Sequence, residues 1–128
     1  MQKLKAAIDG KFPIKDKGPI SFFLNMHLVR NRPERTIFIH QATKINKLLA
    51  DFEMSGCVPA KLPADPELLL SKDMCPSSDD DIAHMSRYPY KALVGRLLYL
   101  AITCRPDLSP AVSALGRFSA NPGTVHSE

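Results

Sequence analysis

"LVGRLLYLAITCRPD", residues 93–107, is the most apolar stretch of the 128-residue chain, and it decides how the C-terminal part folds. Its pattern predicts a helix that is introduced by Tyr88 and Pro89 and runs to about Thr103. Gly95 lies in the middle of this helix, where a glycine costs roughly 1 kcal/mol of helix stability relative to alanine. We therefore expect something to approach the backbone closely at Gly95.

Two kinds of neighbour would explain this glycine. Lys91, Gly95 and Tyr99 fall four residues apart and share one stripe of the helix, whereas leucines cover the other faces. On the pattern alone, the favoured neighbour is the helix predicted over residues 106–118, packing tightly on the glycine. The alternative is a nucleic-acid backbone or minor-groove edge, lying on a stripe made of a cation, a gap and an aromatic ring.

The composition is that of one globular domain, because 45% hydrophobic and 23% charged residues exclude disorder throughout the chain. A net charge of +4 and a pI near 9.1 suit a polyanionic partner, although many ordinary intracellular domains are equally basic. The basic residues gather in three groups, each either a solvated face or a polyanion contact: Lys3, Lys5, Lys11, Lys15 and Lys17; Arg30, Arg32 and Arg35; Lys91 and Arg96.

Cysteine usage and hydropathy indicate an intracellular protein. The three cysteines are too few and too scattered for a disulfide framework, and no stretch has the features of a signal peptide. Arg96 interrupts the most apolar segment, so no apolar run reaches the length of about 20 residues that crosses a bilayer. We expect no transmembrane segment and no membrane partner.

The N-terminal part predicts a short amphipathic helix followed by a hairpin. "ISFFLNMHLVR" alternates with period two and predicts one long strand, with Ile20, Phe22, Leu24, Met26 and Leu28 on one face. "TIFIHQ" predicts a second strand, so we expect an antiparallel hairpin from about Ile20 to His40. The turn-forming "NRPER" gives this hairpin a basic tip.

The remaining segments complete an α+β fold with an antiparallel β-hairpin and about four helices. "QATKINKLLADFEMSG" predicts a helix that ends in a glycine cap at Gly56, and "PDLSPAVSALGRF" predicts the last helix. We divide the chain into residues 1–56 with the hairpin, a loop-rich connection over 57–86, a helical segment over 87–122 and a tail over 123–128.

No catalytic or metal-binding residue is assigned. The four histidines and three cysteines lack the close CxxC or HxxxH spacing of a zinc site. Asp79–Asp81 follow "PSS" in a loop-like context, so we interpret them as part of a solvated connection. Cys104 lies at the C-terminal end of its predicted helix, the wrong end to stabilise a thiolate.

"YKALVGRLLYLAITCRPDLSPAVSALGRFSANP" resembles the segment that follows the polymerase palm in copia-type LTR retrotransposon Pol polyproteins, where "LVG.L.YL", "T.RPD" and "AV..L.RF...P" recur in that order. The upstream part is similar to the family's "F.MKDLG...YFLGI.V.R....I.L.Q..YI..LL..F.M..C" stretch, so the resemblance covers essentially the whole chain. The chain departs from the pattern at six positions: Lys17, Asn25, Met26, Lys44, Leu62 and Cys104. Asn25 stands where the family has glycine.

The resemblance implies the end of a reverse transcriptase palm followed by a helical thumb. The hairpin would correspond to the primer-grip region, and the helix around Gly95 to the thumb helix that runs along the template–primer duplex. The candidate nucleic-acid-binding residues are then Lys91, Gly95, Arg96, Tyr99, Arg30, Arg32 and Arg35. The glycine would admit the duplex, the tyrosine would contact sugar and base edges, and the lysine would neutralise phosphate.

The family's catalytic aspartates, which lie in a "YVDD"-like turn and hold Mg²⁺ in the parent polymerase, have no counterpart here. We expect them upstream of Met1 and the RNase H domain beyond Glu128, so the chain alone would be inactive and without a cofactor. Its partners would be an RNA–DNA or DNA duplex and these missing palm and RNase H portions, in the cytoplasm or in virus-like particles. The alternative is a structural or protein-interaction remnant of a decayed transposable element.

Overall fold

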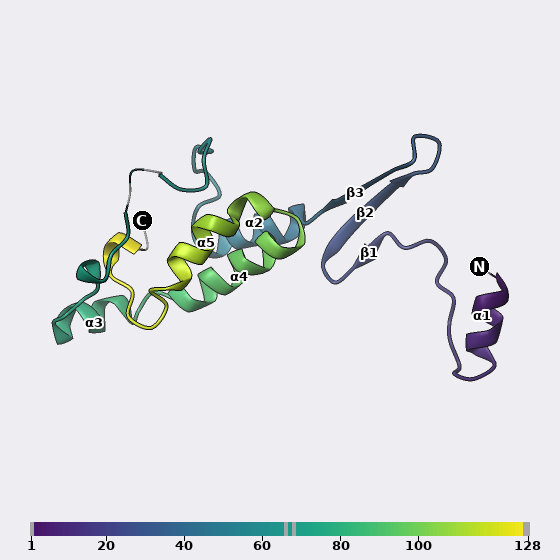
Figure 1. Cartoon of the computed structure of the whole chain (residues 1–128), viewed down its shortest axis with the longest axis horizontal. Coiled ribbons are helices and arrows are strands. Elements are labelled where there is room, and N and C mark those ends of the chain that lie inside the picture. The colour runs from purple at the N-terminus through teal and green to yellow at the C-terminus, as the bar shows by residue number, and fades with distance from the viewer. Residues whose placement is uncertain (1, 66, 68, 127–128) are drawn as a thin grey trace. The chain divides into compact units, whose positions relative to one another are not determined.

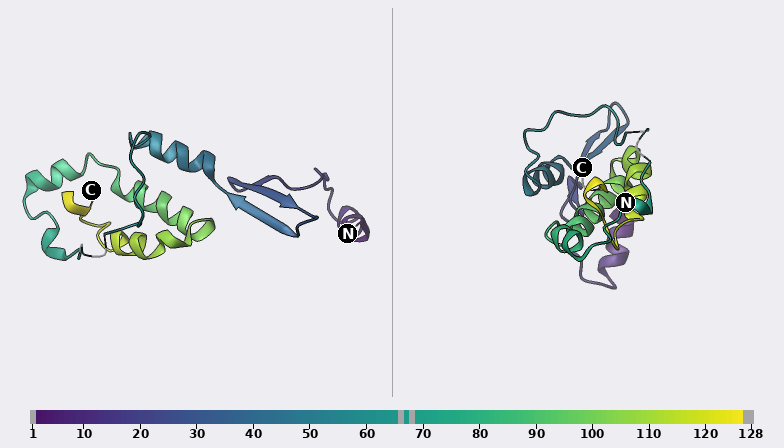
Figure 2. Two further views of the ribbon diagram at one scale, coloured as in Figure 1. Left: turned by 90° about the horizontal axis from the view of Figure 1, so that it is seen from above. Right: turned by 90° about the vertical axis from the view of Figure 1, so that its left-hand side faces the viewer.

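The computed structural model describes residues 2–65, 67 and 69–126, which divide into two units. The N-terminal unit comprises Met1–His40 and the C-terminal unit comprises Gln41–Glu128. Each unit is described by itself below (Figures 1 and 2). This division places the helix after the hairpin in the C-terminal unit.

The N-terminal unit contains α1 (Gln2–Asp9) and a three-stranded antiparallel sheet in the order β1-β2-β3. The strands are β1 (Phe22–Phe23), β2 (Met26–Asn31) and β3 (Thr36–His40). β2 and β3 form the predicted hairpin, with His27 opposite His40 and Asn31 opposite Thr36. The predicted α+β class is confirmed by this sheet together with the helices of the chain (Figure 1).

The prediction of one long strand over residues 20–30 was wrong, because a two-residue turn at Leu24 and Asn25 separates β1 from β2. Both residues have positive φ, 48° and 63°, which is the backbone geometry of the type I′ turn that suits two-residue hairpins. Asn25 occupies a left-handed position that glycine and asparagine tolerate best. Asparagine at residue 25 therefore suits this turn.

The turn also changes which side chains share a face of the sheet. Phe22 pairs with His27, and Phe23 pairs with Met26, so each pair lies on one face. Simple alternation had placed Phe22 with Met26 instead. The described residues of the N-terminal unit include no buried side chain, and α1 likewise buries none.

The C-terminal unit is helical. Its α-helices are α2 (Ala42–Asp51), α3 (Asp79–Met85), α4 (Tyr90–Thr103) and α5 (Ser109–Gly116). Three short 3₁₀ turns accompany them: η1 (Lys72–Met74), η2 (Pro106–Leu108) and η3 (Thr124–His126). The bounds of α4 agree with the helix predicted after Tyr88 and Pro89.

The core of this unit forms where α4 packs against α5 and η2. The two helices α4 and α5 run side by side in Figure 2. Tyr90 and Val94 of α4 and Val112 of α5 are buried together. Partly buried leucines surround them: Leu97, Leu108 and Leu115. The Tyr90 hydroxyl donates a hydrogen bond of 2.9 Å to the carbonyl of Leu115, which ties the first turn of α4 to the end of α5.

α2 ends earlier than predicted. Its last turn is closed by hydrogen bonds from the Glu53 amide to Ala50 O and from the Met54 amide to Leu49 O, with Glu53 at a φ of 58°. This is the Schellman pattern, in which the residue after the C-cap adopts the left-handed conformation. The predicted C-terminal cap of this helix at Gly56 was therefore wrong, because Glu53 takes the left-handed position expected for the glycine.

The connection and the tail are more ordered than their composition suggested. Asp79–Asp81 form the first turn of α3, where Ser78 caps the helix by accepting from the Asp81 amide. Gly123 packs so closely on η1 that a Cβ at this position would overlap the carbonyl of Met74. Asn121 Nδ2 also donates to Pro76 O at 3.0 Å. Residues 121–126 therefore close over residues 72–78.

Candidate nucleic-acid interface

Gly95 lies on an exposed part of α4. A Cβ built on it meets no heavy atom within 4 Å, so no neighbouring part of the described chain requires a glycine there. The packing explanation that the pattern favoured is therefore wrong for this chain. α5 instead contacts the side of α4 that carries Tyr90 and Val94. The glycine leaves an open strip of helix backbone on the surface.

Lys91 and Tyr99 flank this strip, as their four-residue spacing predicted. Lys91 is exposed and Tyr99 is half-buried. Lys44 of α2 places its ammonium 3.5 Å from the centre of the Tyr99 ring, a cation–π contact. Lys44 thereby joins the α4 stripe as a second cation, although it comes from another helix. No local pattern in the sequence indicated that contribution.

Arg96, another predicted contact residue, is engaged within the chain. Its guanidinium donates to Asp51 Oδ2 at 2.5 Å, and Lys47 reaches the other carboxylate oxygen at 3.3 Å. The hydrogen bond from Arg96 and the nearby Lys47 hold the pKa of the Asp51 carboxyl below its usual value. Asp51 therefore offsets part of the positive charge that Arg96 would offer to a polyanion.

Side-chain contacts align α2 antiparallel to α4. Gln41 and Thr103 meet at one end, where Thr103 Oγ1 lies 2.8 Å from Gln41 Oε1. Asp51 and Arg96 meet at the other end. Gln41 is only 1% exposed, so this amide–hydroxyl contact is the buried anchor of α2 beside α4. The contacts made by Gln41 and Asp51, at the two ends of α2, therefore hold Lys44 beside Tyr99.

The hairpin arginines form a separate set in the N-terminal unit. Arg30 and Arg32 line one open hollow of about 610 Å³, together with Pro19, Ile20, Asn31 and Pro33. Arg35 closes the tip through a 3.2 Å hydrogen bond from its amide to Arg32 O and adopts a φ of 54°. The structure thus brings Arg30 and Arg32 to one hollow and leaves Arg35 at the end of the turn.

Formal charge is distributed unequally between the units. Residues 1–40 carry eight lysines and arginines against three carboxylates, a formal charge of +5, whereas residues 41–128 carry nine against ten, a charge of −1. Among the described residues 2–40, Lys5 of α1 forms an ion pair with Asp16, and Glu34 is the only acidic residue of the tip segment 30–35. The net positive charge of the chain therefore lies in the N-terminal unit.

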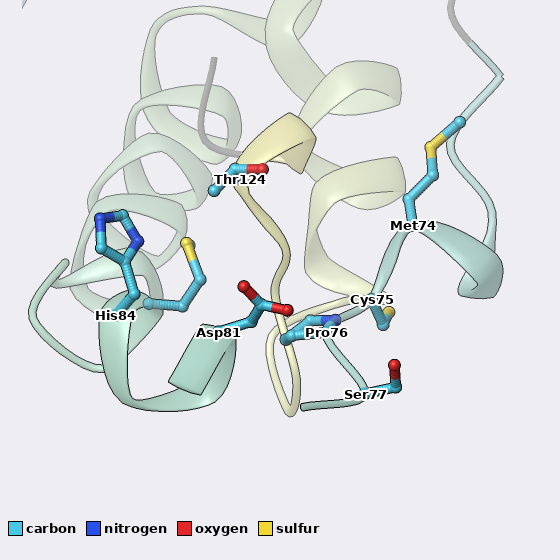
Figure 3. A pocket seen from close by; sticks show the side chains of 8 residues that line it. Met74, Cys75, Pro76, Ser77, Asp81, His84 and Thr124 are labelled. Carbon is cyan, nitrogen blue, oxygen red and sulfur yellow. The ribbon is translucent and has the colours of Figure 1, made fainter. Parts of the chain in front are cut away.

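A further pocket of about 230 Å³ lies between η1, α3 and η3, and Figure 3 shows its lining. Cys75 and His84 lie on opposite sides of it, with the Asp81 carboxylate between them. Ser78 Oγ donates to Asp81 Oδ2 at 2.6 Å, so this carboxylate serves the cap of α3. The arrangement does not pair a nucleophile with a base.

The described part of the chain offers no group of three histidine, cysteine, aspartate or glutamate side chains that could hold a metal ion. Among the same residues, no helix is long and apolar enough to cross a membrane.

Sequence comparison finds relatives among transposon proteins. The retrovirus-related Pol polyprotein from transposon TNT 1-94 of Nicotiana tabacum is 37% identical over 126 residues, covering 98% of this chain and 10% of the polyprotein. A transposon Ty5-1 protein of Saccharomyces cerevisiae is 29% identical over 126 residues, covering 98% of this chain and 39% of that protein. An uncharacterised mitochondrial protein of Arabidopsis thaliana is 28% identical over 110 residues, covering 83% and 40%.

The chain thus spans a tenth to two fifths of the length of these curated relatives. No family model matches the sequence, and no solved structure matches it.

Proposed function

Because relatives of this chain include a retrovirus-related Pol polyprotein and a transposon Ty5-1 protein, we propose that it is a fragment of the reverse transcriptase region of a copia-type element and helps to hold the template–primer duplex. The duplex would lie along α4, over the strip that Gly95 leaves open. In this proposal the chain supplies positioning contacts, and the rest of the polymerase supplies the chemistry.

One observation carries the proposal: Gly95 is exposed, and nothing in the described chain needs it. A glycine in an exposed helix interior costs roughly 1 kcal/mol without any packing benefit. A ligand that must come within contact distance of the helix backbone would account for that cost. A nucleic-acid sugar–phosphate edge is such a ligand.

The neighbouring side chains suit the same ligand. Lys91 would neutralise phosphate at one end of the strip. Tyr99 would meet sugar and base edges at the other end, with Lys44 over its ring adding positive charge. Arg30, Arg32 and Arg35 lie in the N-terminal unit, where they would bind nucleic-acid phosphates independently of the α4 strip. Arg96 would contribute less, because Asp51 already holds it.

The described residues do not fit the Mg²⁺ that the parent polymerase would use, because their carboxylates do not gather into a metal site. No step of the proposed role passes through a metal, and we expect no polymerase activity from the chain alone. The palm and RNase H portions of a polyprotein would be its neighbours, in the cytoplasm or in virus-like particles.

The test is fluorescence anisotropy of a labelled RNA–DNA hybrid titrated with the purified chain at about 50 and 200 mM salt. Gly95→Gln adds a neutral side chain to the open strip, and we expect it to weaken binding about tenfold. The same change should stabilise α4 by up to about 1 kcal/mol, because glutamine favours helix and the space is empty. Ser113→Gln, at an exposed site of α5, is the matched control.

Lys91→Ala should leave the fold unchanged and reduce the slope of log affinity against log salt by about 1. A Gly95→Gln chain that is more stable and binds the hybrid as tightly as wild type would contradict the proposal. So would a folded wild-type chain that does not bind the hybrid at all.

A second candidate function is a structural or protein-interaction remnant of a decayed element. The apolar side chains exposed on α4 favour it, since Leu98 is 44% and Ile102 is 75% exposed. Salt separates the two readings: phosphate contacts weaken steeply as salt rises, whereas an apolar protein contact does not.

A further inference from the structure

One face of the sheet in the N-terminal unit carries a connected row of rings. Phe22 and His27 lie edge to face with centroids 4.9 Å apart, and His27 stacks on His40 at 5.0 Å with the planes inclined by only 10°. Phe38 continues the row, with its ring 5.5 Å from that of His40. We call these four residues the ring row.

The register explains why the four rings meet. His27 stands opposite both Phe22 of β1 and His40 of β3, and Phe38 precedes His40 by two residues on the same strand. All four side chains therefore project from one face. The opposite face carries Phe23, Met26, Leu28, Ile37 and Ile39, and also Arg30, which pairs with Ile37.

The outer rings of the row are open to solvent. Phe22 is 54% and Phe38 is 63% exposed, while the two histidines between them are half-buried. Phe22 and Phe38 therefore each leave more than half of their surface exposed. Exposed aromatic rings on a sheet are the type of surface on which nucleic-acid bases stack.

The charge of the unit identifies the kind of partner. The ring row lies in the unit that carries a formal charge of +5, and Arg32 and Arg35 lie in the turn that joins its two longer strands. An apolar protein segment would be matched by the rings but would gain little from this charge. A single strand of nucleic acid offers both unpaired bases and phosphates.

We propose that the ring row binds the unpaired bases of single-stranded RNA or DNA, while the basic tip of the hairpin binds the adjoining phosphates. This site is separate from the α4 strip, which would hold a duplex. It depends on the geometry of the sheet and does not require that the α4 proposal be correct.

The experiment uses the full chain and a short oligothymidylate carrying one 2-aminopurine, whose fluorescence falls when the base stacks. An abasic oligonucleotide of equal length keeps the phosphates and removes the bases. We expect the oligothymidylate to bind about fivefold more tightly than the abasic strand and to be quenched on binding.

Phe22→Leu and Phe23→Leu form a matched pair, because the two residues are adjacent in β1, are both 54% exposed and lie on opposite faces. Phe22→Leu should abolish the preference for bases and the quenching, and Phe23→Leu should preserve both. If the amide spectrum shows that Phe22→Leu disturbs the sheet, Phe38→Leu in β3 takes its place.

Equal binding of the two oligonucleotides, equal losses in the two leucine variants, or no single-strand binding would each overturn the proposal. The RNA–DNA hybrid is titrated in parallel. If any of these outcomes occurs while the chain still binds the hybrid, only the proposal for the ring row is rejected. Loss of hybrid binding in Gly95→Gln bears only on the proposal for the α4 strip.

Discussion

In the C-terminal unit each of the four α-helices contributes a buried residue, whereas the described residues 2–40 of the N-terminal unit contribute none. The helical unit packs its apolar side chains around Tyr90, Val94 and Val112. The sheet unit forms its strands through hydrogen bonds and tight turns and leaves apolar side chains open on both faces. Regular secondary structure in this protein therefore forms both with a packed core, in the C-terminal unit, and without buried residues, in the N-terminal unit. The unit without buried residues is also the one with the positive formal charge.

Removing core volume should give the largest effect and should distinguish the units. Leu100→Ala empties a site that is 3% exposed and should lower the free energy of unfolding by about 2–5 kcal/mol. Ile37→Ala removes a side chain that is 60% exposed and should change it by less than about 0.5 kcal/mol. Urea denaturation followed by circular dichroism measures both. Comparable losses would mean that the sheet is covered in solution.

The turn at Asn25 should give an intermediate effect within the N-terminal unit. Asn25→Val puts a β-branched residue at a φ of 63° and should destabilise the pairing of β1 with β2 by about 1–2 kcal/mol. Asn25→Gly should preserve it, because glycine adopts this conformation freely. Hydrogen exchange of the strand amides measures the change, and similar protection in the valine and glycine variants would contradict the assigned turn.

The ion pair between α2 and α4 should give the smallest effect, because both partners are exposed. The pKa of Asp51 is held below its usual value of 3.8, chiefly by the hydrogen bond from Arg96. A carboxyl with a lowered pKa stabilises the folded chain above that usual value and stops doing so as the pH falls through the lower, folded-state pKa. Thermal unfolding should therefore show that the stability contributed by this ion pair does not fall between pH 7 and pH 5.

Asp51→Asn should lower the melting temperature slightly at neutral pH, and this difference should shrink as the pH falls through the folded-state pKa of the wild-type carboxyl, where that carboxyl also becomes protonated. Asp107→Asn is the control, since Asp107 pairs with Arg105 only two residues away and joins no helices. An Asp51→Asn effect that grows on acidification would contradict the sign of the shift.

The elements with strong local patterns could be predicted from the sequence. The apolar run after Pro89 defines α4, and the two β-branched and aromatic runs define β2 and β3. The break between β1 and β2 could not be predicted, because Leu24 continues the alternation and nothing marks a leucine for positive φ. α3 was missed although a signal existed, the Ser78 and Asp81 spacing of a helix cap.

The alignment of the candidate residues along one side of α4 could be predicted from the sequence, but the contacts that other helices make with them could not. The spacing of Lys91, Gly95 and Tyr99 follows from helix geometry alone. The position of Lys44 on the Tyr99 ring and the ion pair that engages Arg96 join residues far apart in the sequence. Whether the glycine was buried or open also depended on where α5 packs, which no local pattern specifies.

The contact that closes residues 121–126 over residues 72–78 bears on how the chain emerges during synthesis. Asn121 is made 45 residues after its partner Pro76, which corresponds to about 2–9 s at about 5–20 residues per second. During that interval α3, α4 and α5 are translated, and the contact of Met74 with Gly123 cannot yet form. The contact of residues 121–126 with residues 72–78 can therefore form only after the other helices of this unit have been translated. A ribosome paused before Gly123 would hold a helical unit that lacks this contact.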